Sequence, residues 1–250
     1  MPRTASDRHH LAMAHELKGD RCLPSVPAQL FLRQHLEQRV LRMLRRHGLW
    51  QRLPAIRVLD VGCGNGQWLI DLETWGARPE RLAGIDLRRA GEAQRRLPNA
   101  DIVSGSAERL PWPDASFDLV LQSTLFSSLP GWSLRERVAD EMTRVLRPGG
   151  AILWYDLFVP SRNPDVVQVR AEELQTLFAT YSVDRERVTL AAPVARRLYP
   201  RAPWAAHVLR ATTLLNTHYL AVLTPPKRVA APRRPVAAPA HEAPVLQAVS

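Results

Sequence analysis

The residues best suited to chemistry form a short run in which glycines alternate with other residues at the end of an apolar segment. The run reads Val58-Leu59-Asp60-Val61-Gly62-Cys63-Gly64-Asn65-Gly66, and a helix-forming segment follows it directly. Glycines at alternate positions let the backbone turn sharply and bring its N–H groups to a ligand without a Cβ in the way. Two kinds of ligand fit such a turn, a dinucleotide and a nucleoside that carries a sulfonium. The dinucleotide pattern needs its third glycine at position 67, which is Gln67, so the spacing disfavours it.

A second element contributes a carboxylate. The segment Leu82-Ala83-Gly84-Ile85-Asp86 is apolar until its last residue, which lies twenty residues after Gly66. At the end of a neighbouring parallel strand, a carboxylate can accept hydrogen bonds from both ribose hydroxyls of an adenosine. Asp86 could instead cap a helix that begins near Arg88. The two roles are compatible, and we expect Asp86 to help bind a nucleoside.

These residues are positioned by a chain in which β-rich segments alternate with helical ones. Strands are predicted at 56–61, 82–86, 101–104, 117–122, 151–155, 184–191 and 218–223. Helices are predicted at 29–50, with Gly48 near its end, and at 67–75, 88–96, 133–146 and 167–181. Such alternation is typical of a parallel sheet that is covered by helices on both faces.

Five ordered motifs in this chain resemble those of class I S-adenosylmethionine-dependent methyltransferases. They are Asp60-Val61-Gly62-Cys63-Gly64-Asn65-Gly66, Gly84-Ile85-Asp86, Gly105-Ser106-Ala107-Glu108-Arg109-Leu110-Pro111-Trp112, Ser116-Phe117-Asp118-Leu119-Val120 and Leu146-Arg147-Pro148-Gly149-Gly150. The resemblance covers about 56–156 and is to the methyltransferase type 11 family, in the branch of the quinone-biosynthesis C-methyltransferases. It implies an α/β fold, a doubly wound seven-stranded Rossmann-like sandwich of strand order 3-2-1-4-5-7-6 with strand 7 antiparallel. It also implies a turn at 146–150 that ends a helix and starts the fifth strand.

The same resemblance implies S-adenosyl-L-methionine as the cofactor and gives each matching residue a role. Asp60 would lie near the ammonium group, and Asp86 would hold the ribose. The other residues implied in cofactor binding are Gly62, Gly64, Asn65 and Gly66 around the methionine moiety, Leu87, Ser106, Ala107 and Glu108 around the adenine, and Gln122 and Ser123 at the end of the fourth strand. Many relatives carry an aspartate at the position of Ser106, so a neutral contact would replace a charge-assisted one here.

The group that would activate the acceptor is less well defined by the sequence. Some relatives in the quinone branch place histidines just after the fourth strand, whereas residues 125–130 contain none. Tyr155 and Asp156 end the fifth strand, at the edge where open α/β sheets bind ligands, and are the candidate catalytic residues. Asp156 could equally cap the following turn. A base could also come from the leading region, which contains His9, His10, His15 and His35, while Arg162 and Asn163 could bind the acceptor.

The charge of the chain raises the question of polyanionic partners. The formal net charge is +10, and Lys18 and Lys227 are the only lysines among 34 basic residues. A basic chain can bind nucleic acid or an anionic surface. The arginines are scattered and no recognition motif accompanies them, so we interpret the charge as a compositional bias and disfavour a nucleic-acid partner. Cys22 and Cys63 are the only cysteines and cannot form a four-thiolate site, and we expect no bound metal.

The composition divides the chain into three parts. We predict a leading arm and helical lid at 1–50, a methyltransferase domain at 51–224, and a Pro/Ala-rich disordered tail at 225–250. The lid and residues 192–214 are expected to cover the acceptor site. No segment reads as a membrane span or an export signal, so we expect a cytoplasmic protein of unknown oligomeric state.

The function expected is methyl transfer to an oxygen or carbon of a small organic acceptor, such as a glycan precursor or a secondary metabolite. Two alternatives keep the cofactor, a non-catalytic scaffold that binds S-adenosylmethionine and an RNA methyltransferase. A nicotinamide oxidoreductase is a third rival, but the chain lacks the third glycine of that class and its Tyr-x-x-x-Lys pair.

Overall fold

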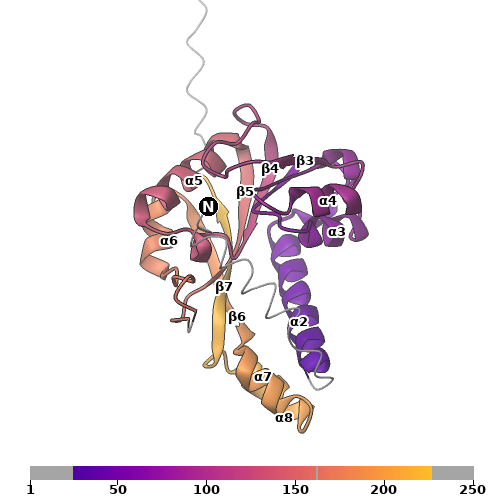
Figure 1. The fold of residues 1–250 in the computed structure, drawn as a ribbon, viewed down its shortest axis with the longest axis vertical. Helices are drawn as coiled ribbons and strands as arrows, with labels where there is room; N and C mark the ends of the chain where they lie inside the picture. Colours follow the sequence, from indigo (N-terminus) through magenta and orange to yellow (C-terminus); the bar gives the residue numbers. More distant parts are fainter. Residues whose placement is uncertain (1–24, 162, 227–250) are drawn as a thin grey trace, which may run out of the picture.

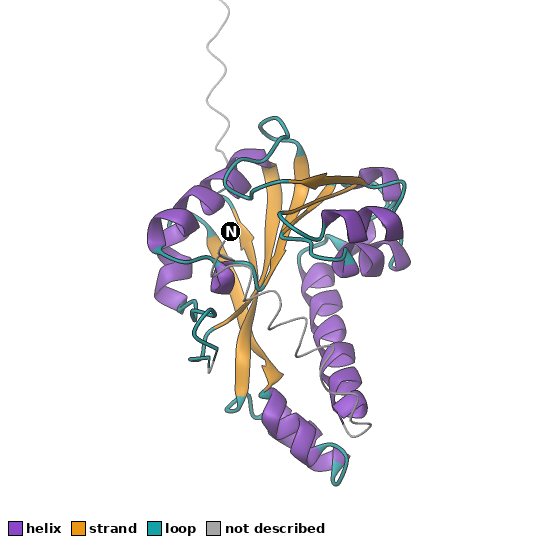
Figure 2. Ribbon diagram, in the orientation of Figure 1, coloured by secondary structure: helices purple, strands orange, loops and turns teal. Residues whose placement is uncertain are grey.

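A computed structural model describes residues 25–161 and 163–226, which fold around one seven-stranded sheet (Figures 1 and 2). The strands are β1 (Val58–Val61), β2 (Leu82–Asp86), β3 (Asp101–Ser104), β4 (Phe117–Ser123), β5 (Leu146–Leu157), β6 (Ser182–Leu190) and β7 (Asn216–Thr224). Their order across the sheet is β3-β2-β1-β4-β5-β7-β6. β7 runs antiparallel to both of its neighbours, and the other adjacent strands are parallel. The predicted order and the antiparallel seventh strand are confirmed.

Helices cover both faces of this sheet (Figure 1). The described helices are α2 (Ser25–Arg46), α3 (Gln67–Thr74), α4 (Ala90–Arg96), α5 (Trp132–Val145), α6 (Ala171–Leu177), α7 (Ala192–Leu198) and α8 (Pro203–Ala211), with short 3-10 turns η1 (Trp50–Arg52), η2 (Pro79–Arg81) and η3 (Phe126–Ser128). α2, α3 and α4 share one apolar core with one face of the sheet, and α5 and α6 share a second core with the other. Neighbouring strand residues alternate between these cores, as the pleat requires. Leu153 and Tyr155 therefore belong to the first core and Trp154 to the second.

The start of α2 extends past this sandwich and holds a helical hairpin made by α7 and α8. A third, smaller core joins them, formed by Ala28, Phe31, Leu190, Ala195 and Ala206. The Phe31 ring stacks on Tyr199 with centroids 4.5 Å apart and meets His207 edge-on at 4.9 Å. One helix therefore contacts the main sheet with one end and the α7–α8 hairpin with the other.

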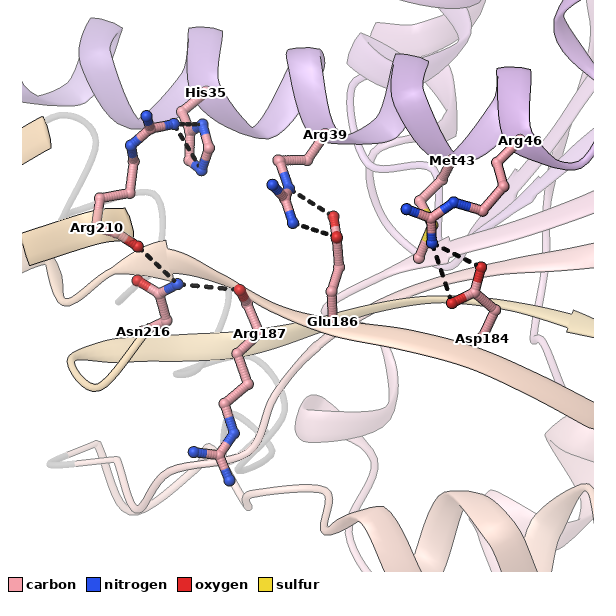
Figure 3. Close-up of polar contacts among 9 residues, drawn as sticks. All are labelled: His35, Arg39, Met43, Arg46, Asp184, Glu186, Arg187, Arg210 and Asn216. Carbon is pink, nitrogen blue, oxygen red and sulfur yellow. Dashed lines mark hydrogen bonds and ion pairs between the residues drawn. The ribbon is translucent and has the colours of Figure 1, made fainter. Parts of the chain in front are cut away.

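Polar contacts also fix α2 to β6 (Figure 3). The Arg39 guanidinium pairs with the Glu186 carboxylate through two nitrogens. Arg46, seven residues after Arg39, donates to both Asp184 oxygens at 2.9 and 3.2 Å. The ring of His47 lies 3.0 Å from the same carboxylate. These contacts repeat at helical spacing, so the side of α2 that carries them follows the strand.

Several elements differ in their bounds from the sequence expectation, among them β5, α6 and β1. The strand β5 begins at Leu146 instead of 151, because 146–150 continue the strand as a bulge rather than forming a separate turn. Gly149 has a φ of +79° in this bulge. Helix α6 begins at Ala171 instead of 167, because the backbone N–H groups of Val167 and Val169 donate to the carbonyls of Ser127 and Leu157 and hold that segment extended. The first strand begins at Val58, two residues later than predicted.

Several predicted features lie outside the described residues. These are 1–24 of the predicted arm, with His9, His10, His15 and Cys22, then Arg162, and all but the first two residues of the predicted tail. Within the described ranges, none of the helices combines the length and the apolar character needed to cross a bilayer.

Candidate functional site

The glycine turn follows β1 directly and is joined to β2. The backbone N–H groups of Gly62 and Cys63 both donate to the Ile85 carbonyl, at 2.8 and 3.0 Å. Gly64 has a φ of +55°, in the left-handed region, and a Cβ added there would meet no protein atom within 4 Å. A Cβ on Gly66 would instead come within 3.1 Å of Ala93. Gly64 is therefore the point where the turn exposes bare backbone, whereas Gly66 allows close helix packing.

Asp86 connects the glycine turn to the start of α4. Its Oδ2 accepts a hydrogen bond from the Gly64 N–H at 3.0 Å, and its Oδ1 accepts from the N–H groups of Arg88 and Arg89 at 2.9 and 2.7 Å. The side chain combines the capping role with a position beside the turn, as the sequence analysis allowed. The capping bonds also explain why α4 begins at Ala90 rather than at Arg88.

Asp60 lies under the same turn and has no partner. It is 1% exposed, and neither carboxylate oxygen has a hydrogen-bond partner within the part of the chain that the structure describes. Burial raises the pKa of Asp60 well above its usual value, and the nearby charge of Asp86 raises it further. A buried carboxylate without a partner is costly, and a cation placed against it would relieve that cost.

The predicted adenine contacts lie on exposed segments. Leu87 is 62% exposed directly after β2. The Ser106 hydroxyl oxygen accepts from the Glu108 N–H at 3.2 Å, so Ser106 closes a local turn. The Glu108 carboxylate accepts from Arg137 Nε at 2.8 Å. The half-buried Ala107 therefore lies between Ser106 and Glu108, whose side chains both form hydrogen bonds. The Asn65 carbonyl accepts from Arg96 at 2.8 Å, so α4 also supports the glycine turn.

Gln122 and Ser123 end β4 beside β1, in register with the glycine turn. Gln122 pairs with Val61 across the two strands. Its side chain is 1% exposed, and its Oε1 accepts from the Leu125 N–H at 3.0 Å. The amide of Gln122 therefore shapes the loop after β4, while Ser123 is half-buried at the strand end.

That loop contributes two residues that the sequence reasoning missed. Thr124 has a φ of +55°, and its N–H donates to the Tyr155 carbonyl at 2.8 Å. The Leu125 side chain covers Gly62 so closely that a Cβ added there would lie 3.0 Å from Leu125 Cδ1. No local pattern in the sequence marks either residue, because the role of Thr124 depends on β5 lying beside β4 and the role of Leu125 depends on β1 lying beside β4.

Tyr155 and Asp156 point to opposite faces of the sheet. The Tyr155 ring lies in the core shared with α2, stacks on His218 at 4.7 Å, and its hydroxyl lies 2.9 Å from Thr189 Oγ1. Burial raises the pKa of the Tyr155 hydroxyl above its usual value, so this hydroxyl stays protonated. Two neighbouring strand residues cannot reach one acceptor from opposite faces.

Asp156 is buried against η3. Its Oδ2 accepts from the Ser127 N–H at 3.2 Å and its Oδ1 from the Leu157 N–H at 2.8 Å. Burial raises the pKa of Asp156 to about 6, against the opposing effect of the Ser127 donors. The carboxylate thus holds the loop after β4, whereas the alternative drawn from the sequence was a cap of the turn that follows Asp156, and it can change charge in the range where enzymes operate.

The histidine of the leading region that is described, His35, also has a structural environment. It is buried on α2 against the Arg210 guanidinium, as Figure 3 shows. Burial and then the charge of Arg210 lower its pKa to about 4. Among the described residues, no three His, Cys, Asp or Glu side chains form a group that could hold a metal ion.

Residues 59–154 match a family model described as a methyltransferase domain. A phthiotriol/phenolphthiotriol dimycocerosates methyltransferase of Mycobacterium ulcerans (strain Agy99) is 40% identical over 121 residues, which are 47% of this chain and 43% of that protein. The chain thus matches less than half the length of that relative.

Solved structures share the fold at low sequence identity. A SAM-dependent methyltransferase from Archaeoglobus fulgidus has a TM-score of 0.54 at 16% identity, over 78% of this chain and 97% of that one. The [4+2]-cyclase SpnF has a TM-score of 0.52 at 22% identity, over 72% of this chain and 80% of that one. A cyclase on this fold indicates that the fold by itself does not define the reaction.

Proposed function

We propose that this protein transfers a methyl group from S-adenosyl-L-methionine to an oxygen or carbon of a small organic acceptor, because residues 59–154 match a family model described as a methyltransferase domain and the sheet has the strand order β3-β2-β1-β4-β5-β7-β6. The observation that carries the proposal is the juxtaposition of three features at one strand edge. Bare backbone at Gly64 lies 3.0 Å from the Asp86 carboxylate, and the unpartnered Asp60 carboxylate is buried beneath the same turn.

The residues fit this cofactor. When bound, S-adenosylmethionine supplies a methyl group on a positively charged sulfur. Asp60 would pair with the ammonium of the methionine moiety, which offsets the cost of burying its carboxylate. Asp86 would accept from the ribose hydroxyls, and Leu87, Ala107 and Glu108 would border the adenine. Gly64 would let the backbone approach without side-chain bulk.

We propose that catalysis depends mainly on positioning. A methyl group moves by in-line displacement, which needs the nucleophile held in contact with it. Of the two catalytic candidates, Asp156 is the better suited to accept a proton, because its pKa of about 6 leaves it ionised at neutral pH. Its two bonds to Ser127 and Leu157 N–H groups make positioning of the β4 loop its first role.

The proposal for the acceptor concerns its chemical class. The Mycobacterium ulcerans relative is named for phthiotriol and phenolphthiotriol dimycocerosates, which supports an organic acceptor rather than a nucleic acid. The sequence favoured a glycan precursor or a secondary metabolite. An RNA acceptor and a non-catalytic scaffold are the alternatives. Formation of S-adenosylhomocysteine with a metabolite extract, and not with RNA, separates the proposed function from both.

Cofactor binding is tested by Gly64→Ala against a matched control, Gly48→Ala. Both glycines have positive φ, at +55° and +66°, and both have open space where the Cβ would go. Each substitution therefore costs a similar backbone strain of about 1 kcal/mol. We expect isothermal calorimetry to show S-adenosylmethionine binding by the wild type and by Gly48→Ala, and at least tenfold weaker binding by Gly64→Ala.

Asp86→Asn is a second test. The amide keeps one oxygen for the N–H groups of Arg88 and Arg89, so the variant should fold, but it loses the charge that binds the ribose. We expect at least tenfold weaker binding of the cofactor. Unchanged affinity in both Gly64→Ala and Asp86→Asn, with folding verified by circular dichroism, would contradict the proposed site.

A further inference from the structure

The α7–α8 hairpin exposes large apolar side chains to solvent. Trp204 is 72% exposed, Val208 55%, Leu214 80% and Leu215 42%. Trp204 and Val208 are four residues apart on α8 and so share one face of that helix. Leu214 and Leu215 follow in the turn to β7. We call these four residues the hairpin apolar patch.

This patch is not the side of the hairpin that packs on the rest of the protein. Ala195 and Ala206 are fully buried and join Phe31 and Ala28 of α2 in the third core. Helix α8 thus has an inner face with alanine and an outer face with tryptophan and valine. Large apolar side chains gathered on an outer face indicate a surface that binds an apolar partner.

The charged residues of the hairpin itself, over 192–215, are all basic. The sequence contains no aspartate or glutamate between Glu186 and Glu242. The hairpin carries the exposed residues Arg196, Arg197 and Arg201, and within the described ranges none of the three has a carboxylate partner. The Arg201 side chain donates to the Arg197 carbonyl at 3.0 Å, which is a contact with an uncharged group. Basic residues beside an apolar patch complement an anionic, partly apolar surface.

We propose that the α7–α8 hairpin docks on an anionic phospholipid surface. Trp204 would lie at the level of the headgroups, and Val208, Leu214 and Leu215 would enter the acyl boundary. The arginines would pair with lipid phosphates. RNA would use the arginines and the Trp204 ring, but it offers nothing to the aliphatic side chains, so the patch favours lipid.

The position of the hairpin gives this docking a consequence for the site. β7 begins at Asn216, directly after the patch, and His218 of β7 pairs with Leu157 at the carboxyl end of β5. The hairpin therefore leaves the sheet at the carboxyl edge where the parallel strands present the candidate site. Docking would hold that edge near the bilayer, so the acceptor would be taken from the membrane surface. The docking itself does not depend on the proposed methyl transfer.

The test is flotation of the full chain with vesicles. One set contains phosphatidylcholine with about a third phosphatidylglycerol, and the other contains phosphatidylcholine alone. We expect the wild type to float with the anionic vesicles at 0.1 M salt, to bind the neutral vesicles much more weakly, and to be released as salt is raised toward 0.5 M.

Two pairs of variants locate the docking surface. Trp204→Ala with Leu214→Ser should weaken partitioning at least tenfold, whereas Trp132→Ala, at a partly exposed tryptophan on α5, should not. Arg196→Gln with Arg197→Gln should weaken it about tenfold or more, whereas Arg78→Gln with Arg95→Gln, which remove the same charge from another surface, should not. All these side chains are at least partly exposed, so folding should be retained.

The proposal is overturned if the wild type does not bind anionic vesicles, if it binds both vesicle types equally, or if each variant binds like its control. If Trp204→Ala with Leu214→Ser changes the mass measured by light scattering without changing flotation, the patch joins two copies of the chain instead. Because vesicle binding needs no cofactor, loss of docking and loss of cofactor binding are measured separately.

Discussion

At the scale of single residues, three carboxylates in this protein differ by what surrounds them. Asp86 accepts three backbone N–H groups, Asp156 accepts two, and Asp60 accepts none among the described residues. Backbone donors stabilise the charged form of a carboxylate, while burial destabilises it. A bound cation would therefore stabilise the charged form of Asp60 more than that of Asp86 or Asp156. S-adenosylmethionine carries such a cation in its ammonium group, which supports the assignment of the cofactor.

The raised pKa of Asp156 predicts how the stability of the variant Asp156→Asn, relative to wild type, changes with pH. The pKa is about 6 in the folded protein and 3.8 for a free side chain, so the contribution of Asp156 to the stability of the wild type falls as pH rises from about 4 to above 6. Asparagine does not titrate. Unfolding by urea at several pH values should show the stability of the variant relative to wild type improving by roughly 2–3 kcal/mol between pH 4 and 7. A difference that stays constant over this range would contradict the environment described for Asp156.

At the scale of elements, α2 is the helix that connects otherwise separate parts of the molecule. It shares the main core with the sheet, forms ion pairs with β6 and packs its first turns on the α7–α8 hairpin. The hairpin shares a small apolar core with α2, in which Phe31 and Leu190 are the large buried side chains and Val194, Leu198, Tyr199 and Leu209 are partly buried. Its stability should therefore depend on α2.

Phe31→Ala tests this dependence. Removing the ring deletes the stack on Tyr199 and the contact with His207, and it should cost about 2–4 kcal/mol of local stability. Hydrogen exchange should become faster in 192–211, whereas β1 and β4 should keep their protection. Leu30→Ala, at a residue of the same helix that is 55% exposed, is the control and should change neither region. Uniformly faster exchange throughout the sheet would show that the hairpin is not a separate unit.

At the scale of the whole molecule, the candidate site lies at the centre of the sheet. β1 pairs with both β2 and β4, so a ligand that contacts the turns after these strands stabilises the packed body as a whole. The arginines that give the net charge of +10 also differ in whether they form ion pairs. Many arginines of the sandwich form ion pairs, such as Arg144 with Glu141, whereas Arg196, Arg197 and Arg201 of the hairpin have no carboxylate partner in the described ranges 25–161 and 163–226.

Ligand binding should therefore raise the melting temperature. S-adenosylhomocysteine at about 100 times its Kd should stabilise the fold by roughly 2.7 kcal/mol, which corresponds to about 5–10 °C in a protein of this size. Differential scanning fluorimetry measures the shift. Gly64→Ala should show little shift at the same concentration, and an equal shift in that variant would place the ligand elsewhere.

The sequence by itself determined the sheet and the turn at its centre. Apolar segments bounded by glycine and acidic residues located β2 and β3 to the residue, and the spacing from Gly66 to Asp86 predicted that the turn and the carboxylate lie together. These features are local, because each depends on the backbone freedom of glycine or on the period of a strand, and both can be read from a short segment.

Only the tertiary structure decided where the side chains around that turn point and what they contact. The bulge that extends β5 back to Leu146, the opposite orientation of Tyr155 and Asp156, and the cover of Leu125 over Gly62 all depend on strands far apart in the sequence. The exposure of Trp204 depends in the same way on which face of α8 packs against α2. Such facts follow from the packing of distant segments, which no short stretch of sequence specifies.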